Sequence, residues 1–355
     1  MKAGLGKTGF ILWPAMEDGS DAVRSKSWDM EVWILYGEDI ESTADLAFEV
    51  RRFMSEATKM DIDLKIFRPA QFDLLVTEET RDSILIDGTP MPLPDFCFPY
   101  LSHGDRSYFS LSIIRQLERL GVNVFNTAST IETVADKLHT HQVLAENALP
   151  TPVTMLAKFP VDIDLIERTI GFPVVVKTLL GSNGTGVFLI ENASAFNDLM
   201  ELIGETNPNI QIIFQKFISM SKGRDLRLFV VDGEVVAAME RRARDGGFKA
   251  NFSAGGSVLE FIPDEKAAEL AVKTAEVLNI KVAGIDLLFS DEGYTICEAN
   301  TFPGFKGLEQ ACQVNVPQKI FDSMRRHMDQ EFGEIPKTVK FEDLRSKEVN
   351  RSSGE

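Results

Sequence analysis

The sequence predicts an α/β protein of two or three domains, and three observations lead to this prediction. The chain has 355 residues, of which 44% are hydrophobic, so it is long enough to build more than one packed core. Over residues 30–130, short apolar runs alternate with segments in which apolar residues recur at helical spacing. Strands that alternate with helices in this way indicate a parallel sheet covered by helices.

The first domain is expected to begin with a buried strand, EVWILY, at 31–36. A helix follows it, because apolar side chains recur at helical spacing between Ala44 and Met54. A second, amphipathic helix is predicted at 107–120, ending at Gly121, a residue type that favours the left-handed conformation after a helix. Four further strands are expected at 63–67, 83–88, 95–100 and 122–126, the second of them turning at Asp87-Gly88.

The second half of the chain is expected to start with a helix at 132–147, which ends before the extended connector Leu149-Pro150-Thr151-Pro152. Two strands, 174–177 and 186–190, flank a glycine-rich turn. Asp232-Gly233 is a hairpin signal that joins two later strands. The remaining elements expected are strands at 211–217, 226–231, 234–241, 282–289 and 294–300, and a helix at 267–278.

Composition excludes several classes of function. Lys and Arg number 37 against 54 Asp and Glu, so the net charge is −17, whereas binding to nucleic acid or to anionic membranes needs a basic surface. The sequence contains no run of 18 apolar residues, so no transmembrane helix is expected. Three cysteines without C-x-x-C spacing support neither a disulfide framework nor a zinc site, and a reducing cytoplasm is the expected location.

The two ends of the chain are not expected to carry function. Gly4, Gly6 and Gly9 satisfy the nucleotide-binding pattern G-x-G-x-x-G, but that motif needs a preceding strand, and no strand fits before residue 4. We therefore expect residues 1–28 to form a flexible leader and 332–355 a flexible tail.

A lysine beside a glycine-rich loop suggests a polyphosphate site. Lys177 ends an apolar strand and is followed by Gly181, Gly184 and Gly186. The ammonium group can meet an anionic oxygen while backbone amides of the loop close over the remaining ones. The alternative is a hairpin with a lysine that reaches solvent, and this segment alone does not decide between the two.

Three oxygen-bearing side chains near the carboxyl end suggest a metal site. Asp286 lies on a predicted strand, and Glu298 and Asn300 lie two residues apart on the next, so both project from one face. Carboxylates on apolar strands are costly without a cation, and oxygen ligands suit Mg²⁺. The alternative is an edge strand whose carboxylates are solvated.

A polar cluster lies between these two candidate sites. Arg227 and Arg241 fall on the paired strands of the predicted hairpin, where they could clamp a carboxylate or a phosphate. The alternative is a ladder of surface ion pairs with neighbouring acids. The cluster consists of Asp225, Arg227, Glu240, Arg241, Arg242, Lys249 and Asn251.

Taken in order, these motifs resemble those of the ATP-grasp superfamily, and within it the RimK-like ATP-dependent amino-acid ligases. The matching stretches are 136–152, 174–187, 215–243, 282–288 and 297–304, roughly half of the chain in one unbroken order. The resemblance implies a Rossmann-like pre-ATP-grasp domain at 29–130 and two ATP-grasp lobes at 131–212 and 213–331. Segments 251–256 and 297–312 are also similar to the N-acetylaspartylglutamate and β-citrylglutamate synthases.

The resemblance also implies roles for individual residues. Lys137 and Lys177 would contact ATP phosphates beneath the loop 181–186, and Asp225 would contact the ribose or the adenine side. Arg241 would stabilise an acyl phosphate and the tetrahedral intermediate, with Arg227 and Lys249 as further catalytic cations. Adenine would be held by the segment Gln215, Lys216, Phe217 and Ile218. Phosphates and metal would face Lys249, Ala250 and Asn251, which stand where the family has Arg-Ser-Asn. The magnesium ligands would be Asp286, Glu298 and Asn300, with manganese as an alternative ion.

The function implied is ATP-dependent joining of an amino acid, with glutamate preferred, to a carboxylate acceptor through an acyl phosphate. The acceptor stays open between a small acid, a peptide and a protein carboxyl terminus, as does assembly into a homo-oligomer. An alternative is a synapsin-like regulatory module that binds ATP with little chemistry. A protein kinase is disfavoured, because its glycine loop would precede the lysine. Arg68, Arg106 and Arg115 are expected at the surface rather than at an anion site.

Overall fold

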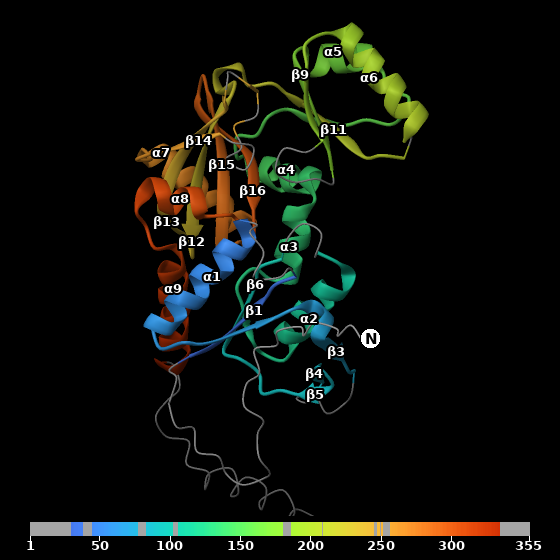
Figure 1. The fold of residues 1–355 in the computed structure, drawn as a ribbon. Coiled ribbons are helices and arrows are strands. Elements are labelled where there is room, and N and C mark those ends of the chain that lie inside the picture. Colours follow the sequence, from blue (N-terminus) through green and yellow to red (C-terminus); the bar gives the residue numbers. More distant parts are fainter. Residues whose placement is uncertain are drawn as a thin grey trace, which may run out of the picture.

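The computed structural model describes residues 30–37, 45–76, 83–101, 106–179, 186–207, 209–244, 247–248, 250 and 256–333. The described residues form three main sheets and a small one, all flanked by helices (Figure 1). This arrangement confirms the predicted α/β fold class. The expected leader at 1–28 lies outside the described residues, and so does the expected tail apart from 332–333, which belong to a helix.

The first main sheet is parallel, as the alternating pattern predicted. Its order is β2-β1-β6-β7, and every adjacent pair is parallel. The central strand β1 is buried, and its residues alternate between two cores: Val32 and Ile34 pack with Phe53, whereas Trp33 and Leu35 pack with Ile113. The strands are β1 (Glu31–Leu35), β2 (Asp63–Phe67), β6 (Phe96–Pro99) and β7 (Asn123–Val124), and the covering helices include α1 (Asp45–Lys59) and α2 (Tyr108–Arg119).

One strand predicted for this region belongs elsewhere. The segment predicted at 83–88 forms β4 (Ile84–Ile86), but β4 pairs antiparallel with β3 (Phe72–Leu74) and β5 (Thr89–Pro90) in a separate small sheet. Asp87 and Gly88 both have positive φ, so the predicted turn is confirmed, and its tight reversal pairs β4 with its immediate neighbour. A short 3₁₀ helix, η1 (Pro69–Gln71), precedes β3.

The single helix predicted at 132–147 is wrong, because the structure divides it in two. Helix α3 (Ala128–Ala135) ends at Asp136, and α4 (Lys137–Glu146) begins there. Asp136 has an extended backbone, and its carboxylate accepts a hydrogen bond from the His139 N–H, as an N-cap does. The break puts Lys137 at the first turn of a new helix.

The second main sheet is antiparallel and has the order β10-β9-β11-β8. Helices α5 (Ile163–Thr169) and α6 (Ala193–Thr206) cover one of its faces around Phe196 and Phe214. Figure 1 shows this lobe standing apart from the rest of the molecule. Its strands are β8 (Thr154–Leu156), β9 (Val174–Thr178), β10 (Val187–Ile190) and β11 (Ile212–Lys216).

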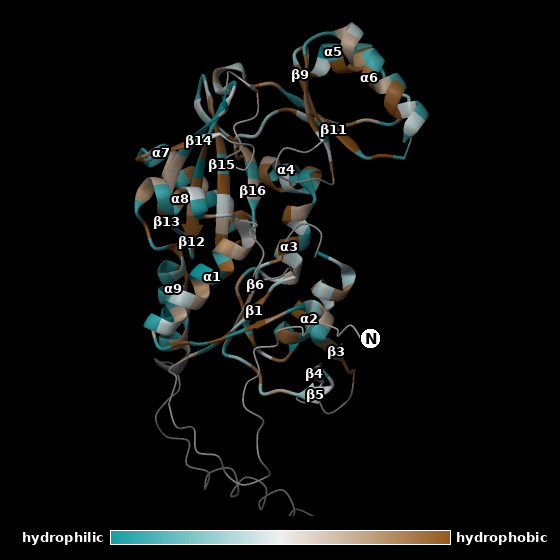
Figure 2. Ribbon diagram, in the orientation of Figure 1, coloured by the Kyte–Doolittle hydropathy of each residue, from teal (hydrophilic) through white to brown (hydrophobic). Residues whose placement is uncertain are grey.

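The third main sheet has the order β14-β13-β12-β15-β16 and is antiparallel throughout. Helix α7 (Glu265–Val277) packs on one face, while α1, α8 (Lys306–Cys312) and α9 (Val316–Gly333) cover the other. Figure 2 shows apolar stretches in brown on β12 and β15, whereas the region of β14 is largely hydrophilic. The strands are β12 (Arg224–Val231), β13 (Glu234–Arg242), β14 (Ser257–Glu260), β15 (Val282–Ser290) and β16 (Gly293–Asn300), and η3 (Ser219–Ser221) leads into β12.

A single buried asparagine links the first sheet to the third. Asn126 follows β7, and its amide nitrogen donates to the carbonyls of Val282 and Thr301 at 2.9 and 2.8 Å. Its amide oxygen accepts from the backbone N–H groups of Lys281 and Val282 at 2.9 and 3.1 Å. The side-chain amide therefore uses both of its N–H donors and accepts two hydrogen bonds at its oxygen, so none of its polar groups is left unpaired. The described residues contain no helix long and apolar enough to cross a membrane.

Candidate active site

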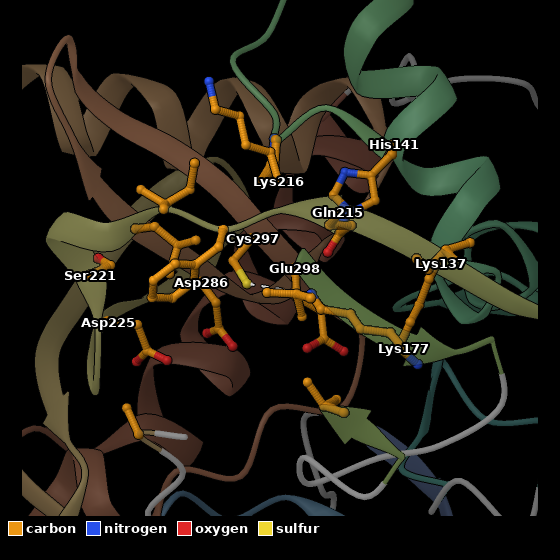
Figure 3. A pocket seen from close by; sticks show the side chains of 18 of the residues that line it. Lys137, His141, Lys177, Gln215, Lys216, Ser221, Asp225, Asp286, Cys297 and Glu298 are labelled. Atoms are coloured by element: carbon orange, nitrogen blue, oxygen red, sulfur yellow. Dashed lines mark hydrogen bonds between the residues drawn. The ribbon is translucent and has the colours of Figure 1, made fainter. Parts of the chain in front are cut away.

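A cavity lies between the second and third sheets, where most of the residues singled out in the sequence meet. Strands β9 and β11 form one wall, β12, β13, β15 and β16 form the other, and α4 closes one end (Figure 3). The residues predicted for the site that line this cavity are Lys137, Lys177, Gln215, Lys216, Phe217, Ile218, Asp225, Arg241, Asp286 and Glu298.

Two lysines from different elements converge on one end of the cavity. Lys177 extends from β9 and lies 3.9 Å from the Cys297 sulfur, whereas Lys137 starts α4 and donates to the Leu179 carbonyl at 3.2 Å. Burial lowers the pKa of Lys137, while the nearby Glu298 carboxylate opposes that shift. Two partly desolvated ammonium groups beside one carboxylate leave a positive field that suits a polyanion.

The glycine loop is described only at its end. Gly186 has a φ of +72°, and a Cβ there would collide with the Thr178 side chain, so the chain needs glycine at this position. Gly181 and Gly184 lie outside the described residues, as do Lys249 and Asn251. Their predicted roles stay predictions.

Four alternating charges form a buried network at the floor of the cavity. Arg227 binds Asp286 through two hydrogen bonds of 2.7 and 2.8 Å, and Arg241 binds Asp225 through two of 2.6 and 2.9 Å. Arg241 also donates to Asp286 at 2.8 Å, which joins the two pairs. The register makes this possible, because Arg227 pairs with Asp286 and Asp225 with Arg241 across adjacent strands. The alternative of a surface ladder fails for these four side chains, which are largely buried.

The pKa values of the two aspartates in this network are shifted in opposite directions. Burial by itself raises the pKa of Asp286, but two guanidinium groups outweigh it, and the pKa lies below its ordinary value. Burial raises the pKa of Asp225 above its ordinary value, although Arg241 opposes that rise. The pKa of Arg241 is raised, since the attraction of both carboxylates exceeds the effect of burial. The network thus holds a charged Asp286 between two arginines.

The three residues predicted to bind metal lie on adjacent strands, but only two of them face the cavity. Asp286 and Glu298 are direct cross-strand partners, and both line it. A bulge after Asp286 makes Cys297 the extra residue of β16, which brings its sulfur into the cavity as well. Asn300 pairs with Gly284 and does not line the cavity within the described part of the chain, although its buried amide nitrogen lacks a hydrogen-bond partner there.

The donor chemistry of these strands fits a hard cation. Among the described residues, no hydrogen bond or ion pair engages the Glu298 carboxylate, so its oxygens are accessible to a ligand. Asp286 has both oxygens on arginines and would have to share them. No group of three His, Cys, Asp or Glu side chains could hold a metal in the described part of the chain, so the Asn300 amide oxygen or an oxygen of a bound ligand would have to complete the coordination.

The opposite end of the cavity is apolar and suits a flat ring. Lys216 ends β11, and Phe217 and Ile218 follow it towards β12. The Phe217 ring packs edge-on against Phe248, with 5.9 Å between the ring centres. Apolar side chains from both sheets also line the cavity. They are Val175, Val187, Ile213, Leu288 and Ala299, and the strand register places Val187 and Ile213 beside Lys177.

Three residues at or near the site were missed in the sequence. Cys297 and His141 line the cavity, and Arg106 is largely buried rather than at the surface, with its guanidinium 5.1 Å from the centre of the Phe302 ring. Burial lowers the pKa of Arg106, and Glu298 opposes that shift. No local pattern points to these residues, since each reaches the site through a tertiary contact. Arg227 was expected in the cavity, but it acts there through Asp286 and is not among the described lining residues.

Comparison with known proteins agrees with this geometry. A family model described as the RimK-like ATP-grasp domain matches residues 134–324. A protein of Legionella pneumophila named "Probable alpha-L-glutamate ligase" is 32% identical over 279 residues, which cover 78% of this chain and 91% of that protein. A protein of the same name from Hydrogenovibrio crunogenus is 37% identical over 217 residues, covering 60% and 71% of the two chains.

Solved structures show the same fold at lower identity. The ATP-grasp ligase PsnB, complexed with a phosphomimetic variant of a minimal precursor, Mg and ADP, superposes with a TM-score of 0.64 at 16% identity, covering 84% of this chain and 98% of PsnB. A RimK domain ATP-grasp protein from Sphaerobacter thermophilus gives a TM-score of 0.59 at 19% identity, covering 82% and 98% of the two chains. On the extent of the family match and of the Legionella relative, the chain belongs to the RimK-like ATP-grasp family.

Proposed function

We propose that this protein is an ATP-dependent ligase that joins L-glutamate to a carboxylate acceptor through an acyl phosphate, releasing ADP and phosphate. The observation that carries the proposal is the single cavity in which Lys137, Lys177 and Glu298 meet the Arg241–Asp286 pair. The name of the Legionella relative supports glutamate as the amino acid. The acceptor is a small acid, a peptide or a protein carboxyl terminus.

ATP would lie along the cavity, with its base at the apolar end and its phosphates beside the two lysines. Glu298 and Asp286 would hold magnesium, with Asn300 as the predicted third ligand. Bound magnesium neutralises negative charge on the phosphates and on the transferred phosphoryl group. The PsnB complex with Mg and ADP supports magnesium and an adenine nucleotide as the bound groups, and the relatives give no support to manganese.

The residues of the chain can supply the remaining requirements of acyl transfer. Lys137 and Lys177 would hold the phosphates in place and offset their charge. The Nε and Nη2 groups of Arg241 donate to Asp225 and Asp286. Its Nη1 group would then donate to the oxyanion that forms when the amine attacks. A guanidinium locked by two carboxylates needs no reorganisation when that charge develops.

The chemistry requires no nucleophile from the protein. Cys297 lines the cavity with its sulfur 3.9 Å from the Lys177 ammonium, and burial raises the pKa of its thiol to about 11. At neutral pH this thiol is protonated and therefore a weak nucleophile. All three cysteines are unpaired thiols, which supports a reducing compartment such as the cytoplasm.

The experiment supplies ATP, Mg²⁺ and L-glutamate with a panel of acid acceptors, and measures ADP together with product masses. An acceptor labelled with ¹⁸O in its carboxylate should transfer one label to the released phosphate, because the acyl phosphate bridges the two. Glu298→Gln should abolish product, and the exposed helix variant Glu201→Gln should not. ADP formed without product across the panel, or phosphate free of label, would contradict the proposal.

A second function is favoured by one observation. Both oxygens of Asp286 are engaged by arginines, which leaves them less able to bind the magnesium that phosphoryl transfer requires. A regulatory module would bind ATP tightly and release no ADP with any acceptor, so the same assay separates the two functions.

A further inference from the structure

A chain of hydrogen bonds leads from the backbone to one side chain of the apolar end of the cavity. The Thr154 hydroxyl donates to the Pro152 carbonyl at 2.8 Å. The Gln215 side-chain nitrogen lies 2.8 Å from the Thr154 oxygen and 2.7 Å from Nε2 of His141. On its other side, Nδ1 of His141 contacts the Thr151 hydroxyl. These residues come from α4, β8, β11 and the connector between them.

The chemistry of these partners fixes which way the Gln215 amide points. A carbonyl only accepts, so the Thr154 proton is committed to Pro152, and the hydroxyl offers Gln215 a lone pair. The amide must therefore turn its nitrogen towards Thr154, because its oxygen would place two acceptors 2.8 Å apart. Orientation of a side-chain amide is assigned from its hydrogen-bond network, and here a carbonyl at the end of the chain decides it.

His141 completes the arrangement as a neutral ring. With its nitrogen turned to Thr154, the second N–H of Gln215 points at Nε2 of His141, which must accept it. The ring then carries its proton on Nδ1 and donates to Thr151. Burial, with a further contribution from Lys177, lowers the pKa of His141 to about 4, so the ring is neutral at physiological pH.

The consequence lies in the cavity. Both N–H groups of Gln215 are used, and among the described residues no donor engages its side-chain oxygen. Gln215 is only 2% exposed, yet it lines the cavity, and Figure 3 shows its amide below the His141 ring with the oxygen turned away from that ring. The position directly precedes Lys216 and Phe217, at the end that would receive the base. A fixed acceptor at this place would favour a nucleotide base whose edge carries a hydrogen-bond donor.

We propose that Thr154 and His141 are positioning residues that lock the Gln215 amide with its oxygen towards the nucleotide, so that the site selects a 6-amino purine over a 6-oxo purine. Adenine offers an N–H to this acceptor, whereas hypoxanthine and guanine offer a carbonyl oxygen that repels it. The inference rests on the proposed function, because it requires a nucleotide in this cavity. It goes beyond that function because it assigns the choice of base to Thr154 and His141, two residues that would act on the nucleotide only through Gln215.

The test measures dissociation constants of ATP and ITP by calorimetry, without amino acid or acceptor. The two nucleotides differ in the group at C6, so their ratio isolates the interaction in question. The wild type should bind ATP roughly 100-fold more tightly than ITP, since an acceptor that faces an acceptor leaves both unpaired. Thr154→Val, which is isosteric but presents no lone pair, should reduce this preference about tenfold, chiefly through tighter binding of ITP.

Variants at His141 provide a second, independent arm. His141→Leu should also reduce the ratio, whereas His141→Gln should restore it, because a glutamine oxygen can accept the same N–H. His139→Leu is the matched control: it lies two residues earlier on the same helix and is exposed. A variant that merely disturbs packing weakens both nucleotides together and leaves the ratio unchanged.

Each outcome has a definite meaning. A lower ratio in Thr154→Val and His141→Leu, restored in His141→Gln, supports the relay. Equal binding of ATP and ITP by the wild type overturns the inference but leaves the proposed ligase intact, and so does an unchanged ratio in Thr154→Val. Failure of the wild type to bind either nucleotide overturns the proposed function, and the inference with it.

Discussion

Replacing Asn126 with alanine should weaken the contact between the first sheet and the third and destabilise the protein. The substitution removes four buried hydrogen bonds, two to carbonyls and two from backbone N–H groups. Each is worth about 1 kcal/mol in net terms, and a buried group left unpaired costs about 1–3 kcal/mol. Asn126 also has a φ of +70°, where alanine is worse by about 1 kcal/mol. We expect a total loss of roughly 4 kcal/mol, with water filling part of the gap.

The assay is urea denaturation followed by tryptophan fluorescence, to which Trp33, fully buried in β1 of the affected sheet, contributes along with two other tryptophans. Because a chain with several sheets need not unfold in one step, hydrogen exchange of 282–301 should be measured alongside. Asn126→Gly avoids the steric penalty at positive φ, so its comparison with Asn126→Ala separates that penalty from the lost hydrogen bonds. Asn147→Ala is the control, since its exposed amide makes one bond, to Val143. A loss for Asn126→Ala below about 1 kcal/mol, or equal to that of the control, would refute this reasoning.

Three further predictions concern the site. Glu298→Gln should lower ADP formation by more than about 100-fold, because loss of a residue that only supports a metal ligand already lowers activity by roughly 10- to 100-fold. Calorimetry without metal should show unchanged ATP binding. His141 should lower the free energy of unfolding by up to about 3 kcal/mol as pH drops from 6.5 to 4, because the unfolded chain then binds a proton that the buried ring does not. In urea titrations, His141→Leu should remove this contribution and make the pH slope shallower. Arg106→Gln should preserve or raise the melting temperature, because burial disfavours the charged guanidinium. The same variant should raise the KM for an anionic substrate other than ATP about tenfold, because it loses a charged hydrogen-bond donor. An unchanged activity, an unchanged pH slope or an unchanged KM would contradict the respective prediction.

Much of the secondary structure followed from local patterns. The strand predicted at 63–67 agrees residue for residue with β2, and the turn at Asp232-Gly233 joins β12 to β13 as expected. These elements depend on side-chain alternation and on turn residues that tolerate positive φ, both of which are visible in a short stretch. The break between α3 and α4 at Asp136 was not predicted. The apolar spacing continues across it, and the start of α4 depends on the capping side chain of Asp136 alone.

The candidate site was predictable in membership but not in pairing. Sequence order identified Arg227, Arg241 and Asp286, and strand register then decided that both arginines bind the same carboxylate. The bulge beside Asp286 could not be foreseen either. It turns Cys297 into the cavity, whereas strict alternation would have faced it away.

The sequence by itself determined the fold class, the family motifs and the chemical types of the groups at the site, because these depend on residue identity and spacing along the chain. Only the tertiary structure decided which donors and acceptors are already occupied. The Gln215 amide illustrates the difference, because its orientation depends on Thr154 and His141, which lie 61 and 74 residues away. Hydrogen-bond direction depends on the partners in contact, and packing alone brings those partners together.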